Sequence, residues 1–366
     1  MSEIELVSGP DAPGGELMAG VASVLGTPAD ERRRALRQLP QGLALRLYTA
    51  MARLRAFDER AVILQRQGTI GTYPPYYGEE AVQAASVLAL DDRDWLFPTY
   101  RQNAVATLRG CPPESPMLLW RGNPAGWYDV HRYRTAPICV PVATNYPHAV
   151  GAAWGSRLRG ESTVALAFGG DGSTSPGDFH EACNLAAVVV APVIFLVTNN
   201  QWAISTPLQQ QTKVTRLADK ATAYGIPGVR VDSFDVFACY EAVAAAAARG
   251  RAGLGPTLIE AVGYRLGPHG TADEPSLYRD PERARLWAGM EPLGRAGAAM
   301  VDAGLTTLEA LEEIRESAAA EMLLAGDQLE AVPVPELEEI ADRVHLSTPW
   351  TLSPEHLREP SYPRSG

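Results

Sequence analysis

Apolar residues recur at helical spacing in the first part of the chain. Between Gly42 and Gln67 they stand three or four positions apart, which predicts a helix. A Gly-, Tyr- and Pro-rich loop follows over 68–78, and a second helix is expected over 79–90. Residues 1–40 are rich in Gly, Pro and Ala and carry an Arg cluster, so we interpret them as an N-terminal arm rather than core.

From residue 162 onward, short apolar runs alternate with helical patterns. STVALAF (162–168) and PVIFLVT (192–198) predict strands, with a helix between them over 177–190. Further strands are expected at 229–231 and 257–262, around an Ala-rich helix at 238–248. Such alternation predicts an α/β fold with a mostly parallel sheet and helices on both faces. We divide the chain into the arm (1–40), this domain (41–300), and a C-terminal helical segment and tail (301–366).

Composition and charge exclude several functional classes. The net charge of -11 argues against nucleic acid as a partner, because binding a phosphate backbone needs a basic face. The four cysteines form no CxxC pair and are expected to be reduced and mostly buried. The N-terminus lacks a signal-peptide layout, and the longest apolar run, 185–197, is too short to span a bilayer. We therefore expect a cytoplasmic protein without a membrane partner.

Polar side chains follow two successive predicted strands where each strand ends. Gly170-Asp171-Gly172 comes after the first strand, and Asn200 follows the second, with Trp202 two residues on. Either motif alone is compatible with a tight surface turn. In an open parallel sheet, however, both lie at the edge where ligands bind. A carboxylate, an amide oxygen and a backbone carbonyl suit Mg²⁺ or Ca²⁺ completed by phosphates, and the flanking glycines let the backbone approach a diphosphate.

The stretch 169–207, GGDGSTSPGDFHEACNLAAVVVAPVIFLVTNNQWAISTP, resembles the cofactor region of alpha subunits of 2-oxo acid dehydrogenases. Further similar blocks, in the same order, are YYGEEA (76–81), DWLFPTYR (94–101), VATNYPHAVGAA (142–153), VDSFDVFACY (231–240) and YRLGPHGTADEPSLYR (264–279). The resemblance covers about residues 53–287. It implies the thiamine-diphosphate-binding fold for residues 41–300.

The resemblance also implies roles for single residues. Asp171, Asn200 and the carbonyl of Trp202 match the Mg²⁺ ligands, and His269 matches the catalytic loop histidine that acts in turnover and acyl transfer. Thr144 and Asn145 fall where branched-chain enzymes hold a structural potassium ion, with Asn145 replacing a glutamine. The remaining positions expected to contact thiamine diphosphate are Tyr100, Arg101, Val140, Val142, Gly170, Gly172, Ser173, Ala203 and Ile204.

The implied activity is oxidative decarboxylation of a 2-oxo acid with transfer of the acyl group to the lipoyl group of a dihydrolipoyl acyltransferase. A beta subunit would complete an alpha2-beta2 tetramer and supply the proton-relay glutamate, for which this chain offers no candidate. A branched-chain substrate is favoured over pyruvate, since Asn103 stands where many pyruvate-type relatives have His. Acetoin is a third alternative.

Two rivals from other classes remain. A nicotinamide dehydrogenase would need GxGxxG after the first strand, and GGDGSTSPG does not fit that pattern. A non-catalytic regulatory subunit is kept open by Pro176, which replaces the usual acidic or amide residue after Gly-Asp-Gly. Gly270 replaces the serine that mitochondrial relatives phosphorylate, so regulation at that position is not expected.

Overall fold

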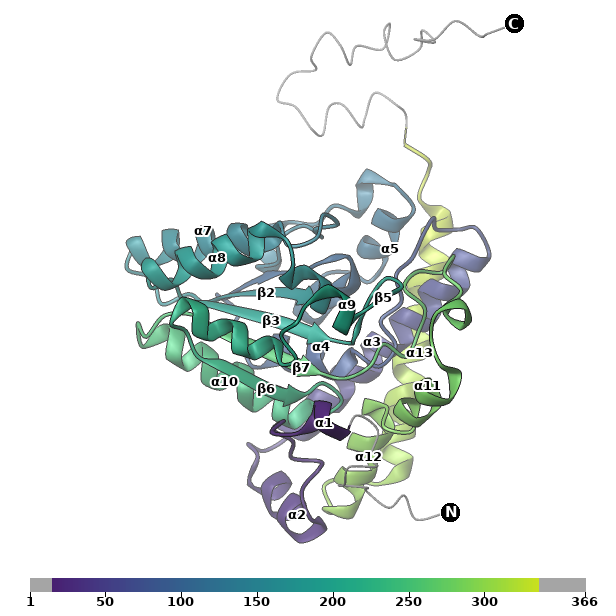
Figure 1. Ribbon diagram of the computed structural model, residues 1–366. Helices are drawn as coiled ribbons and strands as arrows, with labels where there is room; N and C mark the ends of the chain where they lie inside the picture. The colour runs from purple at the N-terminus through teal and green to yellow at the C-terminus, as the bar shows by residue number, and fades with distance from the viewer. Residues whose placement is uncertain (1–14, 336–366) are drawn as a thin grey trace, which may run out of the picture.

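The structure, a computed structural model, describes residues 15–335 (Figure 1). Within that range five strands form a wholly parallel sheet in the order β1-β2-β3-β7-β6, and β4 and β5 form a small antiparallel pair. The strands are β1 (Trp95–Phe97), β2 (Ala165–Gly170), β3 (Val193–Asn199), β4 (Trp202–Ala203), β5 (Thr206–Pro207), β6 (Gly228–Asp232) and β7 (Thr257–Val262).

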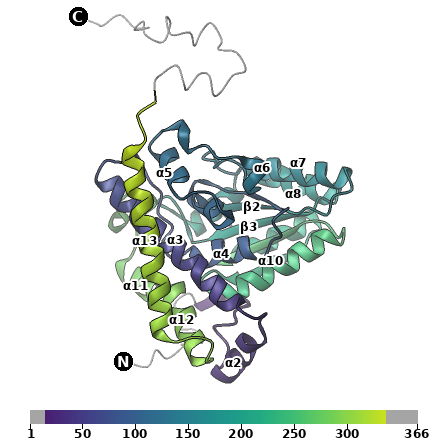
Figure 2. The ribbon, with the colours of Figure 1, turned by 180° about the vertical axis from the view of Figure 1, so that it is seen from behind.

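Helices cover both faces of this sheet. The α-helices are α1 (Gly15–Met18), α2 (Ala29–Gln38), α3 (Leu43–Arg66), α4 (Glu80–Leu88), α5 (Glu114–Trp120), α6 (Val130–Tyr133), α7 (Asn145–Leu158), α8 (Gly177–Val188), α9 (Leu208–Gln211), α10 (Val236–Arg251), α11 (Pro281–Ala288), α12 (Pro292–Asp302) and α13 (Leu308–Ala331). Helices α7 and α8 lie on one face, and α4 and α10 lie on the other (Figure 1). Helix α13 packs along α3 outside that second layer, as the view from behind shows (Figure 2).

The central strands are apolar on both faces, because each face lies against helices. Along β3, Ile194 and Leu196 join the core with α3, α4 and α10, whereas Val193 and Phe195 join the core with α7 and α8. All seven residues of β3 are buried. This two-sided burial explains why the sequence shows an uninterrupted apolar run rather than alternation.

Most elements lie where the sequence predicts them. The helices expected over 42–67 and 79–90 are α3 and α4, and the strand-helix-strand unit is β2-α8-β3. Strand β7 has the predicted bounds, 257–262. Several elements were missed, among them β1, α5 and α7. Strand β1 has only three residues, too few to show a period. Helices α5 and α6 and the start of α7 lie within the Pro-rich stretch 110–150, where the sequence suggested only irregular structure.

The interpretation of residues 1–40 as an arm outside the core is wrong for the part that the structure describes. Leu25 and Leu36 are each only 1% exposed and belong to the main core. Ala22 forms a parallel bridge with Val231 at the edge of the sheet. The sequence hides this packing because the two leucines stand among Gly, Pro and Arg. Residues 1–14 lie outside the described range.

The boundaries drawn at residues 40 and 300 stay predictions. Helix α12 runs across residue 300, and α13 packs against α3, so the C-terminal helices lie against the predicted domain. The tail, 336–366, lies outside the described residues. All four cysteines are free; Cys139 is partly exposed and the other three are buried, as predicted. Over residues 15–335, no helix combines the length and apolarity needed to cross a bilayer.

Candidate active site

The polar residues that follow β2 and β3 meet at one edge of the sheet. Gly170 pairs with Thr198 in register, so Asp171 and Asn200 both emerge just beyond the paired strand ends. A cavity of about 190 Å³ opens at this edge. Its lining contains every residue predicted to bind thiamine diphosphate or Mg²⁺ or to act in catalysis: Tyr100, Arg101, Val140, Val142, Gly170, Asp171, Gly172, Ser173, Asn200, Trp202, Ala203, Ile204 and His269. The structure thus brings together positions that span 170 residues of sequence.

Asp171 is the buried carboxylate of this cavity. Its side chain is 2% exposed, and Oδ2 accepts a hydrogen bond of 2.8 Å from Nε2 of Gln211. Burial raises the pKa of Asp171 to about 6, and the bond from Gln211 opposes that rise. A buried carboxylate with so little compensation is suited to a cation, which would restore the ionised form.

The other two oxygens of the predicted metal set lie nearby. Asn200 donates through Nδ2 to Oε1 of Glu79 at 2.8 Å, and its Oδ1 accepts from the Trp202 amide at 3.2 Å. The carbonyl of Trp202 accepts from Arg265 at 3.2 Å. Two buried oxygens, Oε2 of Glu79 and Oε1 of Gln211, have no hydrogen-bond partner among the described residues. An all-oxygen set with unsatisfied acceptors around it fits Mg²⁺.

Glycine is required where the backbone turns into the cavity. A Cβ at Gly169 would lie 1.8 Å from the hydroxyl of Tyr146, which contacts Oγ of Ser173 at 2.7 Å. A Cβ at Gly172 would lie 2.7 Å from the Cβ of Ala203. A side chain at Gly169 or Gly172 would therefore clash with its neighbours, and glycine leaves the backbone of the motif accessible to a ligand.

Arg101, from the segment after β1, also lines the cavity that contains Asp171 and Asn200. Its guanidinium is buried and donates to the carbonyl of Pro75, to Nδ1 of His269 at 3.1 Å and to the carbonyl of His269 at 3.3 Å. The ring of Tyr100 meets the His269 ring edge to face, with centroids 5.8 Å apart. Both residues predicted to grip a diphosphate thus also contact the predicted catalytic histidine.

His269 is held as a neutral imidazole. Burial and the nearby Arg101 and Arg265 lower the pKa of His269 to about 4. Because Nδ1 faces a guanidinium, which only donates, the proton of the neutral ring belongs on Nε2. The loop is anchored by the bond from the His269 amide to Asp273 at 2.7 Å and by the bond from Thr271 to the carbonyl of Tyr73 at 2.9 Å.

Three further residues of this site had no predicted role: Glu79, Gln211 and Arg265. Glu79 lies within YYGEEA and Arg265 within YRLGPH, so only membership in similar blocks could have drawn attention to them. Gln211 lies on the four-residue helix α9 and shows no signal in the sequence. The nearby tyrosines Tyr73 and Tyr76 are fully buried.

The predicted potassium position shows a different arrangement. Asn145 is buried, and its Nδ2 donates to the carbonyls of Phe97 at 2.9 Å and Phe168 at 2.8 Å. Oδ1 of Asn145 has no partner among the described residues. The amide thus joins the last residue of β1 to β2, and a potassium ion at this place stays a prediction.

Pro176 lies just before α8, at φ -63° and ψ 152°, and that helix has no side-chain cap. A proline at this N-cap position has no side-chain acceptor for the first amides of α8, and its backbone is in the extended conformation usual before a helix. Asn103 is buried, with 2% of its surface exposed, and its Nδ2 donates a hydrogen bond to the carbonyl of Tyr100 at 3.1 Å. Asn103 thus holds the backbone of Tyr100 in place, and it is not among the residues that line the cavity.

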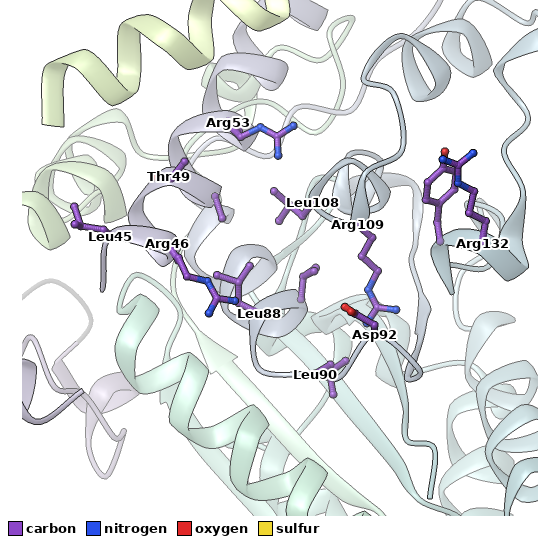
Figure 3. A pocket seen from close by; sticks show the side chains of 13 residues that line it. Leu45, Arg46, Thr49, Arg53, Leu88, Leu90, Asp92, Leu108, Arg109 and Arg132 are labelled. Carbon is purple, nitrogen blue, oxygen red and sulfur yellow. The ribbon is translucent and has the colours of Figure 1, made fainter. Parts of the chain in front are cut away.

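A larger cavity, of about 640 Å³, lies between α3, α4, the turn that precedes β1, the helical turn over 105–109 and α6 (Figure 3). Arg46, Arg109 and Asp92 line it together with leucine side chains, and none of the predicted site residues does. The larger of the two cavities is therefore not the one that the predicted site residues line.

Comparison with known proteins agrees with the geometry. The chain is 47% identical over 292 residues to the 3-methyl-2-oxobutanoate dehydrogenase subunit alpha of Mycobacterium tuberculosis, covering 79% of this chain and 78% of that protein. It is 38% identical over 298 residues to the pyruvate dehydrogenase E1 component subunit alpha of Staphylococcus aureus, covering 80% of each. The corresponding Mycoplasma genitalium subunit is 36% identical over 282 residues, covering 77% of this chain and 79% of that protein. Residues 48–338 match the family described as dehydrogenase E1 component, and the chain belongs to that thiamine-diphosphate-dependent family as an alpha-type member.

Proposed function

We propose that this protein is the alpha subunit of a branched-chain 2-oxo acid dehydrogenase. One observation carries the assignment: all thirteen residues expected to serve the cofactor line a single cavity at the carboxyl edge of the sheet. The higher identity to a 3-methyl-2-oxobutanoate dehydrogenase subunit, 47% against 38% and 36% for pyruvate-type subunits, favours a branched substrate.

The residues present divide the work of holding the cofactor. Asp171, Asn200 and the carbonyl of Trp202 would hold Mg²⁺, and Tyr100 and Arg101 would contact the diphosphate, which a planar guanidinium binds well. When bound, thiamine diphosphate supplies the carbon nucleophile and the electron sink for decarboxylation.

His269 would act on the substrate and in acyl transfer to the lipoyl group of an acyltransferase. As a neutral ring with its proton on Nε2, it can donate a hydrogen bond at that atom while Nδ1 stays bound to Arg101. Arg101 therefore fixes both the orientation and the tautomer of His269.

The site needs a second subunit. Three apolar side chains at its mouth are largely exposed in the isolated chain: Val140 at 58%, Val142 at 48% and Ile204 at 57%. Covering them would exclude water from the cavity. A beta subunit would cover this mouth and supply the proton-relay glutamate, giving the alpha2-beta2 assembly.

Co-expression of the chain with its beta subunit tests the proposal. The ratio kcat/KM would be compared for 3-methyl-2-oxobutanoate, 4-methyl-2-oxopentanoate and pyruvate. We expect the two branched substrates to be preferred by at least tenfold. A tenfold preference for pyruvate would overturn the substrate assignment and leave the reaction class intact. No turnover of any 2-oxo acid would favour a non-catalytic subunit.

A further inference from the structure

Glu79 is the second buried carboxylate of the cavity, and it forms no ion pair within residues 15–335. It is 3% exposed, lies just before α4 and lines the cavity beside Asn200. Among the described residues its side chain forms one hydrogen bond, from Nδ2 of Asn200 at 2.8 Å, and its Oε2 has no partner. Its neighbour Glu80 is also buried but has partners for both carboxylate oxygens: it forms an ion pair with Arg55 and accepts a hydrogen bond from the amide of Gly78 at 2.9 Å.

A buried carboxylate is costly unless something offsets the loss of water. For Glu80 the offset is Arg55. For Glu79 the guanidinium groups of Arg101 and Arg265 give a longer-range offset, and among residues 15–335 the only hydrogen-bond donor to its side chain is the amide of Asn200. Glu79 therefore acts directly on the placement of that amide.

The placement matters because the two ends of an amide are nearly equal in shape and opposite in chemistry. With Nδ2 directed to Glu79, Oδ1 must take the other side, where it accepts from the Trp202 amide at 3.2 Å. If the amide rotated by half a turn, it would present N–H groups to a cation. The Glu79 carboxylate, which accepts from Nδ2, and the Trp202 amide, which donates to Oδ1, both oppose that rotation, and the bond to Glu79 is the shorter of the two.

We propose that Glu79 is a positioning residue that fixes the Asn200 amide with its oxygen toward the metal. The inference rests on the proposed function, because it assumes that Asn200 is a Mg²⁺ ligand. Groups that orient metal ligands typically change metal affinity by about 10- to 100-fold when removed.

The test measures Mn²⁺ in place of Mg²⁺, in the complex with the beta subunit and with thiamine diphosphate present. Electron paramagnetic resonance of free Mn²⁺ gives the dissociation constant without any turnover. We expect Glu79→Met, which has no acceptor, to weaken Mn²⁺ binding about 10- to 100-fold. Glu79→Gln keeps an acceptor oxygen for Asn200 and should stay within about fivefold of wild type (our estimate from the same reasoning). Glu80→Gln is the control for losing a buried carboxylate one position away, and it should not change Mn²⁺ affinity.

A reciprocal swap keeps the proposal testable if Glu79→Met does not fold. In Asn200→Asp two carboxylates face each other, whereas in Glu79→Gln/Asn200→Asp the glutamine amide donates to the new carboxylate. The double variant should bind Mn²⁺ at least tenfold more tightly than Asn200→Asp. The role of Glu79 would be overturned if the double variant and Asn200→Asp bound Mn²⁺ equally well. It would also be overturned if Glu79→Met kept wild-type affinity for Mn²⁺, or if Glu79→Met and Glu79→Gln lost affinity equally. Failure of the wild-type complex to bind Mn²⁺ would instead overturn the proposed function.

Discussion

Replacing Arg101 with methionine should loosen the His269 loop by an amount that the structure allows us to estimate. Nη2 of Arg101 is shared between Nδ1 of His269 at 3.1 Å and its carbonyl at 3.3 Å. A hydrogen bond from a charged group contributes about 1.5–3 kcal/mol. We count the shared contact once, so local opening of the loop should become easier by about that amount. This corresponds to an increase of about 10- to 150-fold in the opening equilibrium.

Hydrogen–deuterium exchange of the complex with the beta subunit, without cofactor, measures this opening. Exchange should accelerate over 266–272 but less over 273–278, because Tyr278 still donates to Asp273 at 2.5 Å. Arg109→Met is the control: like Arg101, Arg109 donates to backbone carbonyls, in its case at 2.5 Å to Asp94, 3.2 Å to Arg134 and 3.5 Å to Asp91, and these partners lie outside the loop. An acceleration of less than threefold in Arg101→Met, or equal acceleration in both variants, would refute the reasoning.

Three other predictions follow from single features. Gly169→Ala should lower the free energy of unfolding by about 1–3 kcal/mol, because the new Cβ would clash with the Tyr146 hydroxyl. Gly177→Ala is the control, since the nearest atom to its new Cβ, Oε1 of Glu181, lies 3.5 Å away and stability should not fall. Thermal melting of both variants measures the difference. The fold lowers the pKa of His269 from 6.5 to about 4, so the stability from keeping it neutral is present above pH 6.5 and lost as pH falls toward 4. Relative to His269→Asn, the wild-type chain should therefore lose melting temperature over that interval, and parallel curves would contradict the pKa shift. The purified alpha chain alone should not decarboxylate any 2-oxo acid, and measurable turnover would show that the proton relay lies within this chain.

The sequence was most informative where local pattern and tertiary role agree. Strand β3 reads as an apolar run because both of its faces are buried, and Asn200 follows it directly. From these facts the meeting of Asp171 and Asn200 could be predicted, since parallel strands end at one edge. Resemblance then added Arg101 and His269, which lie on distant segments that no period connects.

What could not be predicted depends on contacts between distant segments. Glu79 reaches Asn200 only because the loop over 68–78 brings the start of α4 to the edge of the sheet. Leu25 and Leu36 enter the core as single apolar residues in a polar stretch, so no amphipathic pattern marks them. The three residues of β1 are too few to distinguish a strand from a loop.

The most direct test of the central claim is calorimetric titration of the complex of this chain and its beta subunit with thiamine diphosphate and Mg²⁺. The wild-type complex should bind the cofactor. Asp171→Ala should abolish measurable binding while its melting temperature without cofactor stays close to that of wild type, because within the described part of the chain Asp171 accepts one hydrogen bond from another side chain, that of Gln211. Unchanged affinity in Asp171→Ala would contradict the assignment of this cavity as the metal and diphosphate site.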